Sequence, residues 1–287
     1  MRLKSSDKTS IFASAICKKQ SYIENMKRIA TIIFVLTTTF ATAQEYNTLL
    51  AEGTRHINNK EYSKAVGSLE EALQLATGKN DVFNVHANLA YSYMMTGNTD
   101  KALESYSEAL KIDGGNKHLL FQRAAAYMQA GRYDEAIEDC NAAINGDPDN
   151  IDAMLMRAQC YMEKGDNRKA REDYTRVIEL SPKNLNARMG LVMAYKNEKL
   201  YEKATLLIGL LIEEHPEHAT LYIVRSDIEK EQGLYELALM DVEKAIELDP
   251  ENAAYYTLQA ILFESCGKKS AAAKSRNKAE ILKNSQK

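Results

Sequence analysis

Histidine and cysteine are the side chains of this sequence best suited to metal binding or nucleophilic chemistry, and both are sparse. The 287 residues include 5 His and 4 Cys. His215 and His218 flank Pro216 in a predicted turn, but a histidine pair in a turn is usually solvated, so we predict no metal site and no cofactor. The metalloprotease, nucleophile-elbow, phosphate-loop and dinucleotide motifs do not occur in the sequence. A non-catalytic protein is therefore expected.

The cysteines beyond residue 43 show no metal-ligand spacing. Cys140, Cys160 and Cys266 contain no C-x-x-C pair, and no histidine lies close to them in sequence. Buried thiols that pack as small apolar residues are the simplest expectation. Because export would permit a disulfide, a bond between Cys140 and Cys160 is the alternative to test.

A signal peptide is predicted for residues 26–43. Lys27 and Arg28 supply the positive start, residues 29–40 form an apolar stretch, and small residues precede a cleavage after Ala43. The apolar stretch is short for a membrane span. An uncleaved anchor or a plain N-terminal helix is the alternative interpretation.

Residues 1–25 carry no periodic pattern, and we interpret them as a non-structural extension that precedes the true initiator, Met26. The signal peptide predicts an exported protein, periplasmic or associated with a bacterial envelope. No transmembrane span is expected after cleavage.

The charge balance argues against nucleic acid as a general partner. Residues 1–43 hold seven basic and two acidic residues, and without them 30 Lys and Arg face 38 Asp and Glu. An acidic surface repels phosphate backbones. The local exception is residues 268–287, where seven basic residues accompany Glu280. A solvated terminal helix explains that segment most simply; contact with an acidic partner or anionic lipid is the alternative.

A fixed interval of 34 residues organises the rest of the chain. The prolines stand at this interval: Pro148, Pro182, Pro216 and Pro250. Alanine does the same at Ala102, Ala136, Ala170, Ala204, Ala238 and Ala272. An aromatic column holds Tyr93, Tyr127, Tyr161, Tyr195 and Phe263. A glycine column holds Gly97, Gly131, Gly165, Gly233 and Gly267, with Lys60 and Lys199 as replacements. Such a period indicates a repeat architecture.

Each period fits a helix-turn-helix unit. In residues 117–150, apolar and small residues spaced three and four apart predict a first helix. Gly131 suits its end, because glycine accepts the left-handed conformation common past a helix C-terminus. A second helix over residues 133–144 is expected to stop before Pro148, and Asn150 can cap the next helix.

This pattern resembles the tetratricopeptide repeat family. The resemblance rests on small residues at Ala124, Ala136 and Ala143, the tyrosine Tyr127, the glycine Gly131 and the proline Pro148, repeated in register. It covers residues 44–287, in units of about 46–79, 83–116, 117–150, 151–184, 185–218, 219–252 and 253–286, the last as a C-terminal cap. The resemblance implies an all-α fold, a right-handed α-solenoid of stacked antiparallel helix pairs.

The family's geometry implies that the first helices line a concave groove. The inward positions would be Tyr91, Met94, Met95, Phe121, Met128, Leu155, Met162, Met189, Met193 and Ile223. Methionine is flexible and polarisable, and it recurs on surfaces that accommodate varied partners. The same side chains could instead fill the core between neighbouring first helices. The Lys and Asn residues with which chaperone-binding members hold a carboxylate are absent from these columns.

The function implied by this resemblance is a non-catalytic interaction scaffold in the bacterial envelope, which binds a protein or peptide partner in the groove. Two other functions stay open. The chain could be a structural or self-assembling envelope protein, with a homo-oligomer as its product. Alternatively, its basic segment 268–287 could contact anionic lipid or nucleic acid.

Glu229 is the polar exception in the aromatic column. Arg225 precedes it by one helical turn, so an ion pair within the helix is the simplest interpretation. The alternative is that Glu229 contacts a polar ligand in the C-terminal half of the chain.

Overall fold

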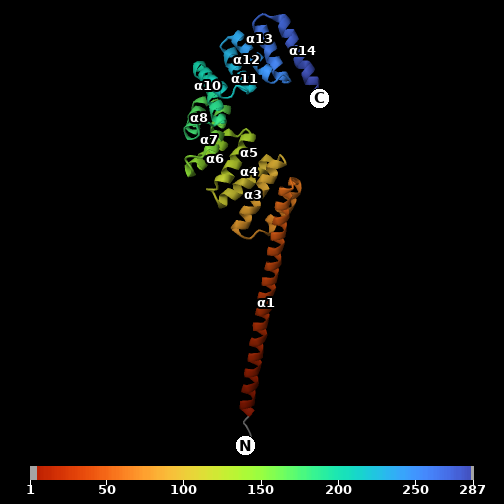
Figure 1. The fold of residues 1–287 in the computed structure, drawn as a ribbon. Coiled ribbons are helices and arrows are strands. Elements are labelled where there is room, and N and C mark those ends of the chain that lie inside the picture. The colour runs from red at the N-terminus through yellow and green to blue at the C-terminus, as the bar shows by residue number, and fades with distance from the viewer. Residues whose placement is uncertain (1–4, 286–287) are drawn as a thin grey trace. The chain divides into compact units, whose positions relative to one another are not determined.

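The structure is a computed structural model built from helices (Figure 1). It describes the backbone of residues 5–285 and the side chains of residues 24–285, and this part of the chain holds 14 helices and no strand. The helices are α1 Ser5–Asn58, α2 Tyr62–Leu75, α3 Lys79–Met95, α4 Thr99–Ile112, α5 Lys117–Gln129, α6 Tyr133–Gly146, α7 Ile151–Glu163, α8 Asn167–Leu180, α9 Leu185–Asn197, α10 Tyr201–Glu214, α11 Ala219–Glu231, α12 Tyr235–Leu248, α13 Ala253–Ser265 and α14 Lys269–Ser285.

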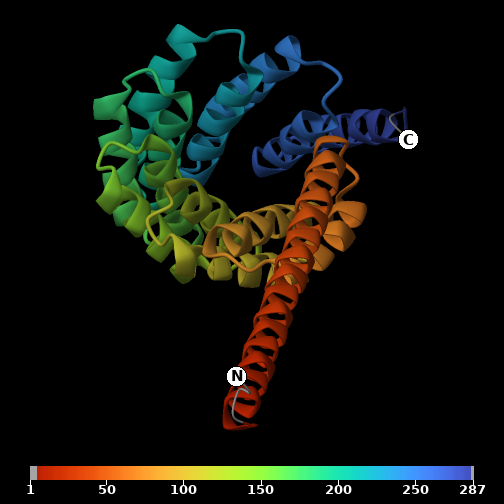
Figure 2. The same cartoon turned by 90° about the horizontal axis from the view of Figure 1, so that it is seen from below.

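The helices belong to two compact units, Met1–Leu119 and Leu120–Lys287. In the first unit, α2 packs between α1 and α3, and α4 packs on α3. In the second unit, each helix from α6 to α14 packs on its neighbours along the chain, and Figure 2 shows these helices in green to blue. The first helices α7 and α9 of two consecutive pairs also contact each other. This nearest-neighbour packing confirms the predicted all-α solenoid of helix pairs.

Small side chains hold the two helices of each pair together. The alanines Ala102, Ala136, Ala170, Ala204, Ala238 and Ala272 are all 0% exposed. Because alanine projects only a methyl group, two helix backbones can approach closely at each of these positions. The core is therefore a chain of local clusters rather than one central core, and the cluster around Ala136 includes Ala124, Cys140 and Cys160.

The turn inside each pair needs a left-handed residue, as the glycine column predicts. Gly131 has φ +71° and Gly165 has φ +77°. Lys60 and Lys199, which replace glycine in two repeats, adopt the same conformation with φ 61° and 59°. The repeat therefore imposes this backbone geometry even on residues with a Cβ atom.

Four of the turns between pairs are four-residue β-turns with proline in the second position. The Asn150 amide donates to the Asp147 carbonyl at 3.1 Å, and the Asn184 amide donates to the Ser181 carbonyl at 2.9 Å. The side chain of Asn150 then accepts a hydrogen bond from the Ala153 amide at 3.0 Å. The predicted asparagine cap is thus present, and it ties the end of one pair to the start of the next.

The N-terminal part of α1 packs against nothing described. Every residue from Glu24 to Glu45 is exposed, and Tyr46 is the first buried side chain, with 6% of its surface exposed. The helical segment Glu24–Asn58 is long and apolar enough to cross a membrane, a property that a signal sequence shares. Of the predicted extension 1–25, residues 1–4 and the side chains of residues 5–23 lie outside the described residues.

Candidate partner-binding site

A cleft of about 500 Å³ lies among the helices α5, α7, α8 and α9 of the second unit. Its lining is Phe121, Met128, Asp152, Leu155, Met156, Gln159, Tyr174, Asn186 and Met189. Three first helices supply all of these residues except Tyr174, which comes from the second helix α8. The cleft therefore joins three consecutive repeats.

Four of the predicted groove residues line this cleft. Phe121, Leu155 and Met189 occupy one column of the repeat, each 34 residues from the next. Because equivalent positions of stacked helices point the same way, one column becomes a continuous apolar strip. Met128 adds a second apolar column. All four side chains are half-buried, and Met128, Leu155 and Met189 also pack against core clusters. These three methionine and leucine side chains therefore line the cleft and also contribute to the core.

The other predicted groove residues do not line the cleft. Met162 packs against the core cluster around Val177, and Ile223 packs against two clusters. Met193 is half-buried outside the cleft lining. Tyr91, Met94 and Met95 belong to the first unit, where the Tyr91 ring meets the Tyr62 ring edge-on at 6.0 Å and Met95 is exposed.

The polar edge of the cleft was not predicted from the sequence. Asp152 and Asn186 are exposed and lie 34 residues apart, so the repeat period could have identified them as equivalent positions on the same face. Gln159 is exposed about two turns further along α7 than Asp152. These groups supply hydrogen-bond donors and acceptors beside the apolar strip.

Tyr174 reaches the cleft only because position 190 is glycine. A Cβ atom at Gly190 would lie 2.3 Å from the Cζ atom of Tyr174, far inside contact distance. The tyrosine ring therefore packs directly on the backbone of α9. Burial raises the pKa of the Tyr174 hydroxyl to about 12.

A column of ion pairs, absent from the sequence prediction, joins the two helices of several pairs. Arg157 contacts Asp173 through two hydrogen bonds, at 2.8 and 2.6 Å, and also donates to Asn141 at 2.6 Å. The same geometry recurs in the pairs Arg123 with Asp139 and Arg225 with Asp241. The sequence signal that could have predicted them is an Arg and an Asp 16 residues apart in three repeats, with Leu191 and Leu207 at the equivalent positions of the intervening repeat, which lacks the pair. These fork-shaped contacts fix the angle between paired helices.

The predicted ion pair between Arg225 and Glu229 is wrong. Arg225 points to Asp241 on α12, because a bidentate contact there satisfies two of its donors. Glu229 is 8% exposed, and its Oε2 atom has no hydrogen-bond partner among the described residues. Burial, with a smaller contribution from Asp241, raises the pKa of Glu229 to about 7.

Cys140 and Cys160 lie in one buried cluster and are not bonded to each other in this structure. Burial raises the pKa of Cys140 to about 12 and that of Cys160 to about 11. Such thiols react slowly. A disulfide between them remains a prediction, and free-thiol counting on the purified protein under denaturing conditions would test it.

Comparisons with known proteins agree with this architecture. Models of the tetratricopeptide repeat match residues 93–138, 127–172 and 162–228, and a further one matches residues 219–252. The crystal structure of a tetratricopeptide repeat protein from Parabacteroides merdae is 26% identical and superposes with a TM-score of 0.69, over 83% of this chain and 93% of that one.

Two further likenesses are more distant or more local. YrrB, described as a TPR protein with an unusual peptide-binding site, is 21% identical with a TM-score of 0.52, over 65% of this chain and 95% of that one. The photosystem I assembly protein Ycf3 of Prochlorococcus marinus is 40% identical over 60 residues, which is 21% of this chain and 35% of Ycf3. The chain thus spans about a third of the length of these curated relatives.

The repeat matches, the helix pairs and the buried alanine column agree with one another. The chain belongs to the tetratricopeptide repeat family.

Proposed function

We propose that the cleft of the second unit binds an extended peptide segment of a protein partner, and that the chain acts as a non-catalytic scaffold. The observation that carries this proposal is the strip of Phe121, Leu155 and Met189, which stays partly exposed and lines one cleft with a polar edge. A preformed apolar surface lowers the ordering cost of binding. YrrB has the same fold and a described peptide-binding site, but at 21% identity it supports the fold alone.

A peptide selected from a random library on the purified full chain provides the probe. Leu155→Glu places a charge in the centre of the cleft, so affinity for the selected peptide should fall at least about tenfold, measured by titration calorimetry. Ile281→Glu, at a side chain 55% exposed on α14, is the matched control and should leave affinity unchanged. Undiminished binding by Leu155→Glu, with a helical melting curve like that of the native chain, would refute the cleft as the binding site.

A second candidate function, self-assembly, is favoured by exposed apolar residues on second helices. Leu206 is 68% exposed on α10, and Met240, at the equivalent position of α12, is 65% exposed. Exposed large apolar groups at repeated positions are typical of interaction surfaces. If this surface joins copies of the chain, Leu206→Glu with Met240→Glu should lower the mass measured by light scattering.

Contact of the basic segment 268–287 with anionic lipid or nucleic acid is a weaker alternative. In the structure this segment contains α14, whose Leu282 is buried, while Lys268 and Arg276 pair with Glu236 and Glu264. Deleting it would expose the core. Charge reversal at Lys274 and Lys283, both exposed, is the cleaner test of salt-sensitive binding.

We further propose that the chain is exported to a bacterial envelope. Packing begins at Tyr46, directly after the predicted cleavage at Ala43, while the preceding apolar stretch is exposed. N-terminal sequencing of protein recovered from an envelope fraction should start at Gln44. Recovery of the uncleaved chain from the cytosol would contradict export.

A further inference from the structure

The turn between α10 and α11 differs from the other inter-pair turns in the side chains at its two ends. The His218 amide donates to the His215 carbonyl at 3.1 Å, with Pro216 in the second position. The Tyr222 hydroxyl donates to the Pro216 carbonyl at 3.1 Å and so holds the turn against α11. His218 makes no side-chain cap on α11, unlike the asparagine of the neighbouring turns.

The backbone of this turn type brings the first and fourth side chains into contact. In the turn from Asp113 to Asn116, the two side chains hydrogen-bond at 3.0 Å, and in the turn from Asp249 to Asn252 they do so at 3.3 Å. With histidine at both ends, the same geometry places two imidazole rings 5.4 Å apart, centroid to centroid. The backbone of the turn therefore holds the ring nitrogens of His215 and His218 close to each other.

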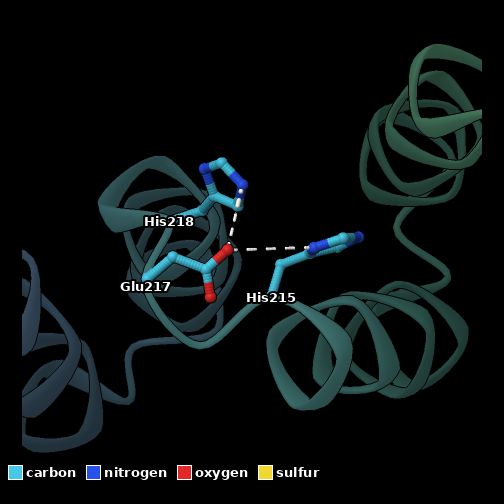
Figure 3. A group of neighbouring side chains, drawn as sticks. All are labelled: His215, Glu217 and His218. Carbon is cyan, nitrogen blue, oxygen red and sulfur yellow. Dashed lines mark ion pairs between the residues drawn. The ribbon is translucent and has the colours of Figure 1, made fainter.

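Glu217, the third residue of the turn, adds an oxygen between the two rings (Figure 3). Its Oε1 atom lies 3.3 Å from His218 Nε2 and 4.0 Å from His215 Nδ1. Each of the three residues offers one possible metal-ligand atom, and these three atoms lie within 4.8 Å of one another. Ligands about 2.1 Å from a tetrahedral zinc ion stand roughly 3.4 Å apart. Small side-chain rotations of these half-buried and exposed residues would close that gap.

We propose that His215, Glu217 and His218 bind a divalent transition-metal cation such as Zn²⁺. Two imidazole nitrogens and one carboxylate oxygen suit Zn²⁺, Cu²⁺ or Ni²⁺, whereas Mg²⁺ and Ca²⁺ require oxygen ligands. The adjacent Glu214 is bound by Arg188 through hydrogen bonds of 2.5 and 2.9 Å, so it supplies no ligand. The remaining coordination position is open to water. This site stands apart from the cleft lining and does not depend on the proposed peptide function.

Titration calorimetry with ZnCl₂ on the untagged full chain tests the site. The native chain should take up one saturable equivalent, and unfolding temperature should rise with Zn²⁺ because the metal binds the folded turn. His215→Ala, His218→Ala and Glu217→Gln should each weaken binding at least about tenfold. No saturable binding by the native chain, or equal binding by these three variants, overturns the proposal.

Two controls separate this turn from other metal ligands. His118→Ala removes an exposed histidine outside the turn, and Cys266→Ser removes the half-buried thiol. Both variants should keep the native affinity for Zn²⁺. Loss of the equivalent in either variant would assign the metal to that residue and overturn the proposal.

The following turn offers a gain-of-function test, because it reads Asp249-Pro250-Glu251-Asn252. Asp249→His together with Asn252→His reproduces the histidine turn there. The double variant should bind two equivalents of Zn²⁺ instead of one, if the turn geometry creates the site. A stoichiometry that stays at one, in a folded double variant, would contradict the assignment of the site to this turn.

Discussion

Glu229 places a carboxylate in a column that holds aromatic rings in most repeats. It is buried, one of its oxygens has no partner among the described residues, and its pKa is raised to about 7. The folded protein therefore holds a proton on Glu229 under conditions in which the unfolded chain, with an ordinary pKa of 4.5, has released it. At the scale of a single residue, the protonation of Glu229 therefore makes the free energy of unfolding depend on pH.

The sign of that dependence follows from the raised pKa. Stability from this group is fully present below pH 4.5 and is lost as pH rises through about 7. The native chain should therefore lose roughly 1–3 kcal/mol between pH 4.5 and pH 8 relative to Glu229→Gln, whose side chain stays neutral. Urea unfolding of both proteins across this range measures the difference. Parallel stability curves would show that Glu229 is not protonated in the fold.

At the scale of single elements, the turns inside the helix pairs set the local geometry. Gly131 and Gly165 adopt the left-handed conformation without a Cβ atom, whereas Lys60 and Lys199 adopt it with one. A non-glycine residue in that region carries a conformational cost of order 1 kcal/mol. The two lysine turns are therefore sites at which the repeat overrides a local preference.

Replacing the lysine by glycine should relieve this cost. Lys199→Gly is expected to raise the free energy of unfolding by about 0.5–1 kcal/mol, since glycine adopts φ near 59° without steric conflict. Lys183→Gly is the control, because Lys183 is exposed in a turn and its φ is not positive. Urea denaturation measures both; an equal or larger gain for Lys183→Gly would disprove the conformational explanation.

At the scale of the whole molecule, each helix packs mainly on the helices next to it in the chain. The local stability of a helix therefore depends on its position in the array. Ile208 of α10 is fully buried in a cluster that includes residues of α9, α11 and α12. Leu282 of α14 is 3% exposed, and α14 packs on α13. An interior helix such as α10 thus has neighbours on both sides, whereas α14, among the described helices, packs mainly on α13.

Truncating these two side chains should produce different patterns of local opening. Ile208→Ala and Leu282→Ala should each cost about 2–4 kcal/mol of local stability. The loss at Ile208 should spread to α9, α11 and α12, whereas that at Leu282 should stay within α13 and α14. Hydrogen exchange followed by mass spectrometry resolves the two patterns. Uniform loss of protection across the second unit in both variants would indicate one cooperative core instead.

The 34-residue columns of small, glycine and proline residues in the sequence determined the helix-turn-helix unit, and the family resemblance implied that these units stack as an α-solenoid. The resemblance to the tetratricopeptide repeat family further implied that Phe121, Leu155 and Met189 face a groove, and these three residues do line one cleft. Only the tertiary structure decided which ion pairs form and which side chains are buried. Arg225 prefers Asp241 on another helix to Glu229 on its own, and Met162 packs into the core beside a cleft that Met128 lines. The physical reason is that periodicity fixes the direction in which a side chain points from its helix. Its burial and its ion-pair partner depend on the side chains of the neighbouring helix.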